Sequence, residues 1–406
     1  MEPGDGKLEK PTPIEIKKVQ EDKNEIKDEN EIKDEIKDEI NDENDEFKID
    51  AKELEFNEQP EIEFKTEEDL EKIKEDIEKI EINGLNFERV LDKLKKTNFT
   101  KLEILSLSNM GIDSLDFLNN ESFKTLIALD IKGTKITSLD KLNEAPFKEL
   151  KILDLSNNAI NSITSLTQCP FKNLQILNLA DNKNIKEVKS IAEAGFKELI
   201  KLDLSSNQID DINCLGNPSL SNLESLYLND NKISDISVLG QQTFKKLKDL
   251  QLSNNQIEKI DVFQEKDRFK DLEELQLCGN QIGSIEAFAE SESDKLRILM
   301  LSKNKITDIK VLTQVPFKNL EKLDLMDNQI ENINDVFNKT PFNESIKELD
   351  LSFNCLRSID VLINKQNFKN LSDLKIECNS NLDYKDKKIK ELFDNYEIKY
   401  TFDPIL

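Results

Sequence analysis

Side chains that could carry catalytic chemistry are scarce in this sequence of 406 residues, and histidine is absent altogether. Without an imidazole the usual acid/base partner of a nucleophile is missing, as are histidine-ligated zinc sites. Paired carboxylates are abundant, but among 83 acidic and 57 basic residues we expect them to be solvated surface groups. The five cysteines show no C-x-x-C spacing, which favours buried, reduced thiols over disulfides or a metal site. We therefore expect no enzyme, no catalytic residue, no cofactor and no metal; the cysteines are Cys169, Cys214, Cys278, Cys355 and Cys378.

The net charge of −26 argues against a nucleic-acid partner, because phosphates must be met by clustered Lys and Arg. No stretch approaches the ~18 uninterrupted apolar residues of a spanning helix, so we expect no membrane insertion. The first residues, Met1 to Gly6, show neither the basic nor the apolar region of a secretory signal. These features favour a cytoplasmic or nuclear location.

Residues 1–65 contain 24 acidic and 11 basic side chains, which is half of the net charge in the first sixth of the chain. Such a segment has too little apolar surface to offset the entropy of ordering, so we expect an acidic, low-complexity, disordered arm. A charged helix docked through the seam of Ile32, Ile36 and Ile40 is the alternative.

Beyond the arm, one pattern repeats every 24–26 residues, as in Leu150-x-x-Leu153-x-Leu155-x-x-Asn158-x-Ile160. It divides the chain into an N-terminal cap helix and degenerate repeat (66–101), twelve repeats (102–382) and a C-terminal cap (383–406) of a helix followed by a closing strand. The repeats start at Leu102, Leu126, Leu150, Leu174, Leu199, Leu223, Leu247, Leu272, Leu296, Leu320, Ile346 and Leu371.

The period-two alternation within each unit predicts a short strand with inward leucines, and stacked units would form a parallel sheet. After each strand, a polar residue such as Asp116 or Ser237 is expected to N-cap a short helical or 3₁₀ turn. A phenylalanine three residues before each new unit, as at Phe147 and Phe171, is expected in the core. An inward asparagine should satisfy backbone groups; this structural ladder consists of Asn158, Asn182, Asn207, Asn231, Asn255, Asn280, Asn304, Asn328, Asn354 and Asn379.

The motif LxxLxLxxNxI over residues 77–382 resembles the leucine-rich-repeat family, in the short-repeat subclass similar to the protein phosphatase 1 regulatory subunit and the internalins. The resemblance implies an α/β fold: a right-handed solenoid, or horseshoe, with a parallel concave β-sheet and short helical or 3₁₀ turns on the convex side. It also implies a non-enzymatic protein-interaction scaffold, of which a phosphatase regulatory subunit is one instance. A secreted or surface adhesin or effector of internalin type is the alternative.

Outward-facing strand positions are free of the packing code and are expected to bind a protein partner. We expect Ile152 and Ile176 to be exposed neighbours that form a hot spot with Tyr227 and an acidic rim. Acidic residues outnumber basic ones by 13 to 5 at these positions, which favours a partner with a basic patch; an acidic face on an acidic protein is the alternative. We expect a monomer. The predicted partner-binding residues are Asp130, Ile152, Asp154, Ile176, Asp203, Tyr227, Gln251, Gln276, Met300, Asp324 and Asp350.

Overall fold

The computed structural model describes residues 64, 66–83, 85–363, 367–383 and 387–396. The chain divides into two units, Met1–Lys48 and Ile49–Leu406, and every described residue belongs to the second unit. The predicted disordered arm, apart from Phe64, and the predicted closing strand lie outside the described residues.

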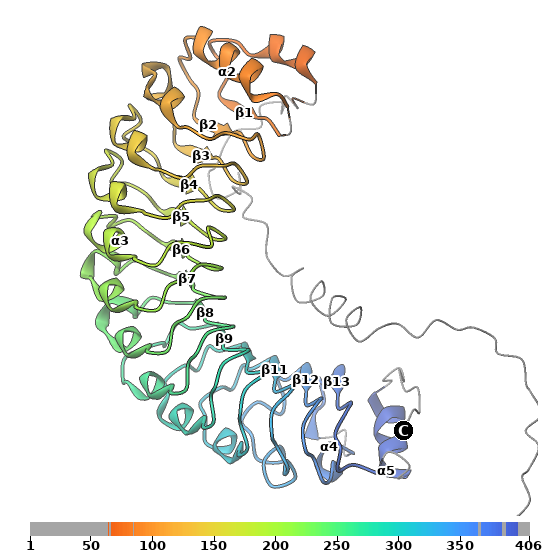
Figure 1. Cartoon of the computed structure of the whole chain (residues 1–406). Helices are drawn as coiled ribbons and strands as arrows, with labels where there is room; N and C mark the ends of the chain where they lie inside the picture. The colour runs from red at the N-terminus through yellow and green to blue at the C-terminus, as the bar shows by residue number, and fades with distance from the viewer. Residues whose placement is uncertain (1–63, 65, 84, 364–366, 384–386, 397–406) are drawn as a thin grey trace, which may run out of the picture. The chain divides into compact units, whose positions relative to one another are not determined.

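The described part contains one parallel sheet of thirteen strands in chain order. Equivalent positions of neighbouring repeats pair directly, as Leu153 does with Leu177, so the expected parallel sheet is confirmed. The strands line the inner side of a curved coil (Figure 1). They are β1 (Lys79–Glu81), β2 (Ile104–Ser106), β3 (Ala128–Asp130), β4 (Ile152–Asp154), β5 (Ile176–Asn178), β6 (Lys201–Asp203), β7 (Ser225–Tyr227), β8 (Asp249–Gln251), β9 (Glu274–Gln276), β10 (Ile298–Met300), β11 (Lys322–Asp324), β12 (Glu348–Asp350) and β13 (Asp373–Lys375).

The core runs along the whole coil because each repeat buries its apolar residues against the next. In the repeat of β4, Leu153, Leu155 and Ile160 have no exposed surface. The predicted phenylalanine spine is confirmed: Phe147, Phe171 and Phe196 are fully buried. Their rings stack with centroids 5.9 and 6.3 Å apart.

Short helical turns return the chain along the outer side, as expected (Figure 1). Most are single 3₁₀ turns, because the return path has no room for a longer helix. They are η1 (Glu67–Lys72), η2 (Asp116–Asn119), η3 (Glu121–Phe123), η4 (Asp140–Glu144), η5 (Thr164–Gln168), α3 (Lys189–Glu193), η6 (Asn213–Gly216), η7 (Pro218–Leu220), η8 (Ser237–Gly240), η9 (Gln242–Phe244), η10 (Asp261–Gln264), η11 (Glu286–Glu290), η12 (Lys310–Thr313) and α4 (Asp360–Ile363).

The predicted N-cap residues of these turns are wrong by one position, because Asp116 and Ser237 are the first residues of their turns and the N-cap residues are Leu115 and Ile236. Ser237 is the first residue of η8, and its N–H donates to the carboxylate of Asp235 at 2.8 Å. Ser114 accepts in the same way from the N–H of Asp116, at 3.2 Å. The residue two positions before the turn supplies the acceptor in this way at η2, η4, η5, η6, η8, η11, η12 and α4, as a side chain that hydrogen-bonds the backbone two residues on.

Helical segments flank the sheet at both ends. Near the N-terminus, a capping box forms at Thr66, whose N–H and hydroxyl both donate to Asp69, at 2.8 and 2.9 Å. The degenerate repeat forms strand β1 and then α2 (Phe87–Lys96), which buries Val90. Near the C-terminus, α5 (Lys387–Tyr396) packs against α4.

Candidate partner-binding face

The asparagine ladder connects each strand to the following turn. Asn231 donates from Nδ2 to the carbonyl oxygens of Leu204, Leu228 and Asn229, at 3.0, 3.1 and 3.0 Å. Its Oδ1 accepts from the N–H of Ile209 at 3.0 Å. The other nine predicted ladder asparagines lie at the equivalent place and donate to three carbonyl oxygens in the same way. After each three-residue strand, the asparagine side chain thus holds the backbone of its own repeat to that of the preceding repeat.

Asn207 is an exception in the ladder, because its buried Oδ1 has no hydrogen-bond partner. The preceding repeat holds one extra residue, so Asn182 and Ile185 are separated by two residues instead of one. Lys183 within this insertion has a left-handed φ of 59°. The insertion removes the N–H that the equivalent oxygen accepts elsewhere.

A left-handed residue precedes each of the ten ladder asparagines and also Met110 and Thr134, which hold the same place in the first two repeats. The twelve residues have φ between 52° and 66°, a conformation that Gly, Asn and Asp adopt most easily. Asp181, Asp230 and Asp327, three of the 13 acidic residues counted on the predicted face, are therefore explained by the backbone conformation at their positions. The row consists of Asn109, Gly133, Asn157, Asp181, Ser206, Asp230, Asn254, Gly279, Lys303, Asp327, Phe353 and Cys378.

The prediction that Ile152 and Ile176 are exposed neighbours is wrong. Ile152 is only 3% exposed and Ile176 is half-buried. Ile152 packs with Ile104 and Ala128 in a small apolar cluster separate from the main core. Neighbouring strands are only about 4.8 Å apart, so side chains at equivalent positions on the inner side cover one another.

The predicted aspartates on the strands make a bond that the sequence analysis missed. Asp154 accepts from the N–H of Ser156 at 2.8 Å, and so closes the end of its strand. The sequence does contain a sign of this bond, because six repeats have an Asp or Asn at the same place, four residues after the first leucine or isoleucine of the repeat. The same bond, at 2.9 to 3.0 Å, forms at Asp130, Asn178, Asp203, Asp324 and Asp350.

Burial changes the acid strength of these carboxyls. It raises the pKa of Asp154 to about 7, with a smaller contribution from the nearby carboxylate of Asp130. Burial likewise raises the pKa of Asp249 and Asp350 to about 6, and it raises the pKa of Asp203. The inner face is therefore less negative below neutral pH than the count of acidic residues suggests.

Tyr227 lies at the centre of a half-exposed polar cluster on β6 to β9. Its hydroxyl donates to the Asp249 carboxylate at 2.6 Å, and Lys201 Nζ lies 5.1 Å from its ring centroid. The predicted residues Gln251, Gln276 and Met300 continue the half-buried surface along the next strands. The accessible part of the inner face therefore begins after the isoleucine cluster.

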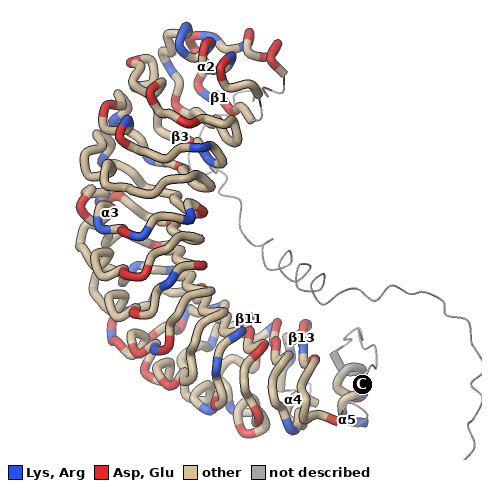
Figure 2. The backbone as a smooth tube through the Cα atoms, in the orientation of Figure 1, with Lys and Arg blue, Asp and Glu red and all other residues tan. Residues whose placement is uncertain are grey.

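The predicted face is not a uniform acidic surface. Acidic and basic residues are interleaved along the whole coil (Figure 2). Within the face itself, Lys322 lies 3.3 Å from the Glu348 carboxylate across neighbouring strands. Pairs of this kind lower the local excess of negative charge.

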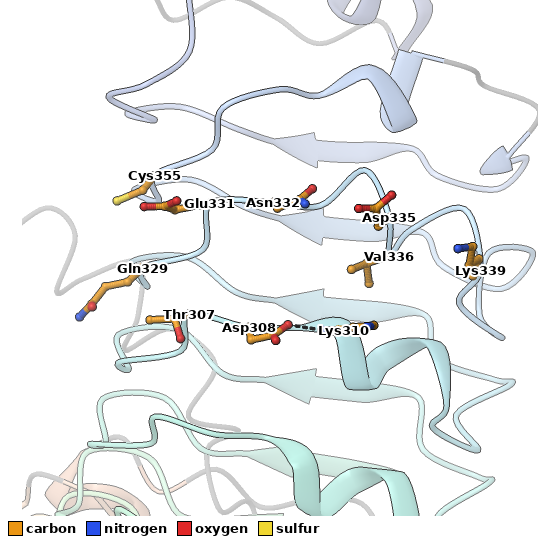
Figure 3. A pocket seen from close by; sticks show the side chains of 10 residues that line it. All are labelled: Thr307, Asp308, Lys310, Gln329, Glu331, Asn332, Asp335, Val336, Lys339 and Cys355. Atoms are coloured by element: carbon orange, nitrogen blue, oxygen red, sulfur yellow. Dashed lines mark hydrogen bonds between the residues drawn. The ribbon is translucent and has the colours of Figure 1, made fainter.

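A depression of about 740 Å³ lies on the flank of the coil, between the return paths of neighbouring repeats (Figure 3). Its lining is mostly exposed and charged, with Asp308, Lys310 and Glu331 among its residues. Small-molecule sites are mainly apolar, so this depression is a poor one.

Three further observations concern the thiols, possible metal ligands and the length of the helices. Cys378 is exposed, so the expectation that all thiols are buried is wrong. Among the described residues, no group of three or more Cys, Asp or Glu side chains is arranged to hold a metal ion. None of the helices in the described ranges is long and apolar enough to cross a membrane.

Comparisons with known proteins agree with this architecture. Leucine-rich-repeat family models match residues 197–241, 245–290, 270–330 and 342–359. No curated protein matches the sequence. Fold and repeat thus define a leucine-rich-repeat solenoid, a class that generally serves as a protein–protein interaction scaffold.

Solved structures make the relationship more specific. An internalin (InlF) of Listeria monocytogenes is 25% identical, with 80% of this chain and 86% of that chain covered and a TM-score of 0.64. A leucine-rich-repeat protein of Leptospira interrogans is 23% identical (77% and 86% covered, TM-score 0.53). The ectodomain of the plant receptor kinase GASSHO1/SCHENGEN3 from Arabidopsis thaliana, solved in complex with CASPARIAN STRIP INTEGRITY FACTOR 2, is 20% identical (73% and 37% covered, TM-score 0.52). The chain is a leucine-rich-repeat protein that resembles the internalins.

Proposed function

We propose that this protein is a non-enzymatic scaffold that binds a protein partner on the inner face of its coil. The observation that carries the proposal is the cluster of Lys201, Tyr227 and Asp249, in which a half-exposed aromatic ring is held by a hydrogen bond and a cation. An oriented tyrosine is a typical anchor of interfaces, because it adds contact area with little loss of side-chain entropy. A partner with a basic patch would complement the neighbouring carboxylates.

A tagged full-length chain recovered from its native cells tests this proposal. Tyr227→Ala combined with Glu274→Lys removes the aromatic ring on β7 and reverses the charge of a residue on β9 of the same inner face. We expect this variant to lose the partner while it unfolds at the same temperature as the wild type. Glu258→Lys is the matched control, since Glu258 is exposed and lies away from the strands. Full recovery of the partner by the double variant would exclude this face.

The proposed location is the cytoplasm or nucleus, and a phosphatase complex is one assembly that such a scaffold could serve. The similarity to an internalin favours a second candidate, a secreted or surface protein of internalin type. Fractionation of the native cells separates the two. Recovery of the protein outside the cell would contradict the first location and support the second.

A further inference from the structure

Phe353 combines two unusual features in the described part of the chain. It is the bulkiest residue of the left-handed row, with a φ of 55°, a conformation that a large side chain disfavours. It is also 50% exposed; among the residues that the structure describes, the other exposed large hydrophobic residue is Ile200, at 39%. Asn or Gly would fit this backbone better. A strained and exposed aromatic residue points to a function outside the fold.

An acidic residue lies on each side of this position, in the two neighbouring repeats. The N–H of Phe353 donates to the backbone oxygen of Glu377 at 2.8 Å, and Ser352 Oγ donates to the Glu377 carboxylate at 2.6 Å. The N–H of Asp327 donates to the oxygen of Ser352 at 2.9 Å. Asp327, Phe353 and Cys378 therefore follow one another in neighbouring repeats, and all three are exposed.

The strands behind this row add more carboxylates. Asp324 and Asp350 pair in register on β11 and β12. Burial is the main cause of the raised pKa of Asp350, and the nearby carboxylate of Asp324 adds to it. Lys303, Lys322 and Lys375 lie in the same region, but the acidic residues outnumber them.

We propose that Phe353 anchors a docking site for a basic segment of a protein partner, with an arginine guanidinium on the exposed ring and the carboxylates of Asp327 and Glu377 beside it. A guanidinium is planar, is weakly hydrated and is attracted to the face of an aromatic ring. This site rests on the proposed function, that the coil binds a protein partner, and it specifies the chemistry of a segment of that partner. It lies at the edge of the predicted face, where the chain leaves β11, β12 and β13.

The test titrates the full chain with a fluorescein-labelled hexa-arginine peptide and, as a neutral counterpart of the same shape, a hexacitrulline peptide. Fluorescence anisotropy at about 0.15 M salt limits long-range attraction by the acidic chain. We expect the arginine peptide to bind and the citrulline peptide not to bind. Phe353→Leu should raise the Kd about 2–5-fold, whereas Phe353→Trp should preserve or lower it. Ile200→Ala, the control for loss of exposed apolar surface, should leave the Kd unchanged.

Equal binding by Phe353→Leu and wild type would overturn the site, as would equal binding of the two peptides. A stability measurement gives a second criterion. Phe353→Asn should raise the midpoint of thermal unfolding, and Asn254→Phe, at the equivalent place in another repeat, should lower it. A lower midpoint for Phe353→Asn would show that the ring serves packing and would also overturn the site. If the Tyr227 and Glu274 double variant keeps the native partner, only the proposed binding through Tyr227 is contradicted. The peptide titration concerns only the site at Phe353, so the two proposals can fail separately.

Discussion

At the scale of single residues, Asn207 and Asn231 offer an internal comparison. Each donates to three carbonyl oxygens at 3.0 to 3.1 Å, but only Asn231 also accepts a hydrogen bond at Oδ1. Asn207 therefore already carries the unfavourable free energy of a buried, unsatisfied acceptor. The ladder is uneven where the repeat length changes.

We predict that Asn231→Ala destabilises the protein more than Asn207→Ala, by about 1 kcal/mol, the value of one additional hydrogen bond. Urea unfolding followed by circular dichroism measures both variants. Equal losses would show that the oxygen of Asn207 finds a partner in solution, such as a water molecule.

Asp154 should make stability depend on pH. Because burial raises its pKa in the folded state to about 7, the folded protein binds the proton more tightly than the unfolded chain does. Stability from this group is therefore present at low pH and is lost as the pH rises from about 4 to 7.

Asp154→Asn should remove this dependence. Asn178 already accepts the equivalent N–H bond, so an amide oxygen can replace the carboxylate oxygen in this bond. We expect the variant to be more stable than wild type at pH 8, by on the order of 4 kcal/mol for a shift of about three pKa units, and to show little difference at pH 4. Urea unfolding at the two pH values checks this, with Asp261→Asn on an exposed turn as the control. A constant difference at both values would contradict the assignment to Asp154.

At the scale of elements, the outer turns depend on the acceptor two residues before them. Asp235 holds the N–H of Ser237 at the start of η8, and this bond lowers the pKa of its carboxyl. The ionised form is thus favoured in the folded state, and its stabilisation is present at neutral pH and declines as the pH falls below about 4.

We predict that Asp235→Ala lowers stability at pH 7 by about 1 kcal/mol, the usual contribution of a capping side chain. Asp235→Ser should retain most of that stability, because Ser284 fills the same role before η11. Equilibrium unfolding in urea distinguishes the two variants. If serine and alanine are equally destabilising, the hydrogen bond to Ser237 contributes nothing.

At the scale of the whole molecule, each described repeat contacts its neighbours in a sheet that runs in chain order. Stability should then be close to a sum of repeat and interface contributions, and a central defect should divide the coil. We predict that Leu250→Ala costs about 2–5 kcal/mol and broadens the unfolding transition. Leu374→Ala, in the last strand, should instead loosen only that end. Hydrogen exchange measured along the chain tests the difference; a single sharp transition for Leu250→Ala would indicate full cooperativity.

The fold could be predicted because the spacing of leucines directly encodes which side chains must be buried together. The positions of Leu153, Asn158 and Phe171 each follow from one repeating pattern. The environment of Ile152 could not be predicted, since its burial depends on how closely strands from different repeats approach on the inner side. The strain at Phe353 also leaves no trace in hydrophobic periodicity, because it is a property of one backbone angle.

Because equivalent residues of neighbouring repeats pair with each other, the number of repeats can change in evolution. A copied block of 24 residues, inserted between two regular units, would meet on both sides the surfaces it met in its original place. Coil length can therefore change through duplication or loss of whole blocks without redesign of distant parts. The repeat with the extra Lys183 is harder to copy or move. In whichever repeat follows it, the ladder asparagine would have a buried Oδ1 that accepts no hydrogen bond, as Asn207 has.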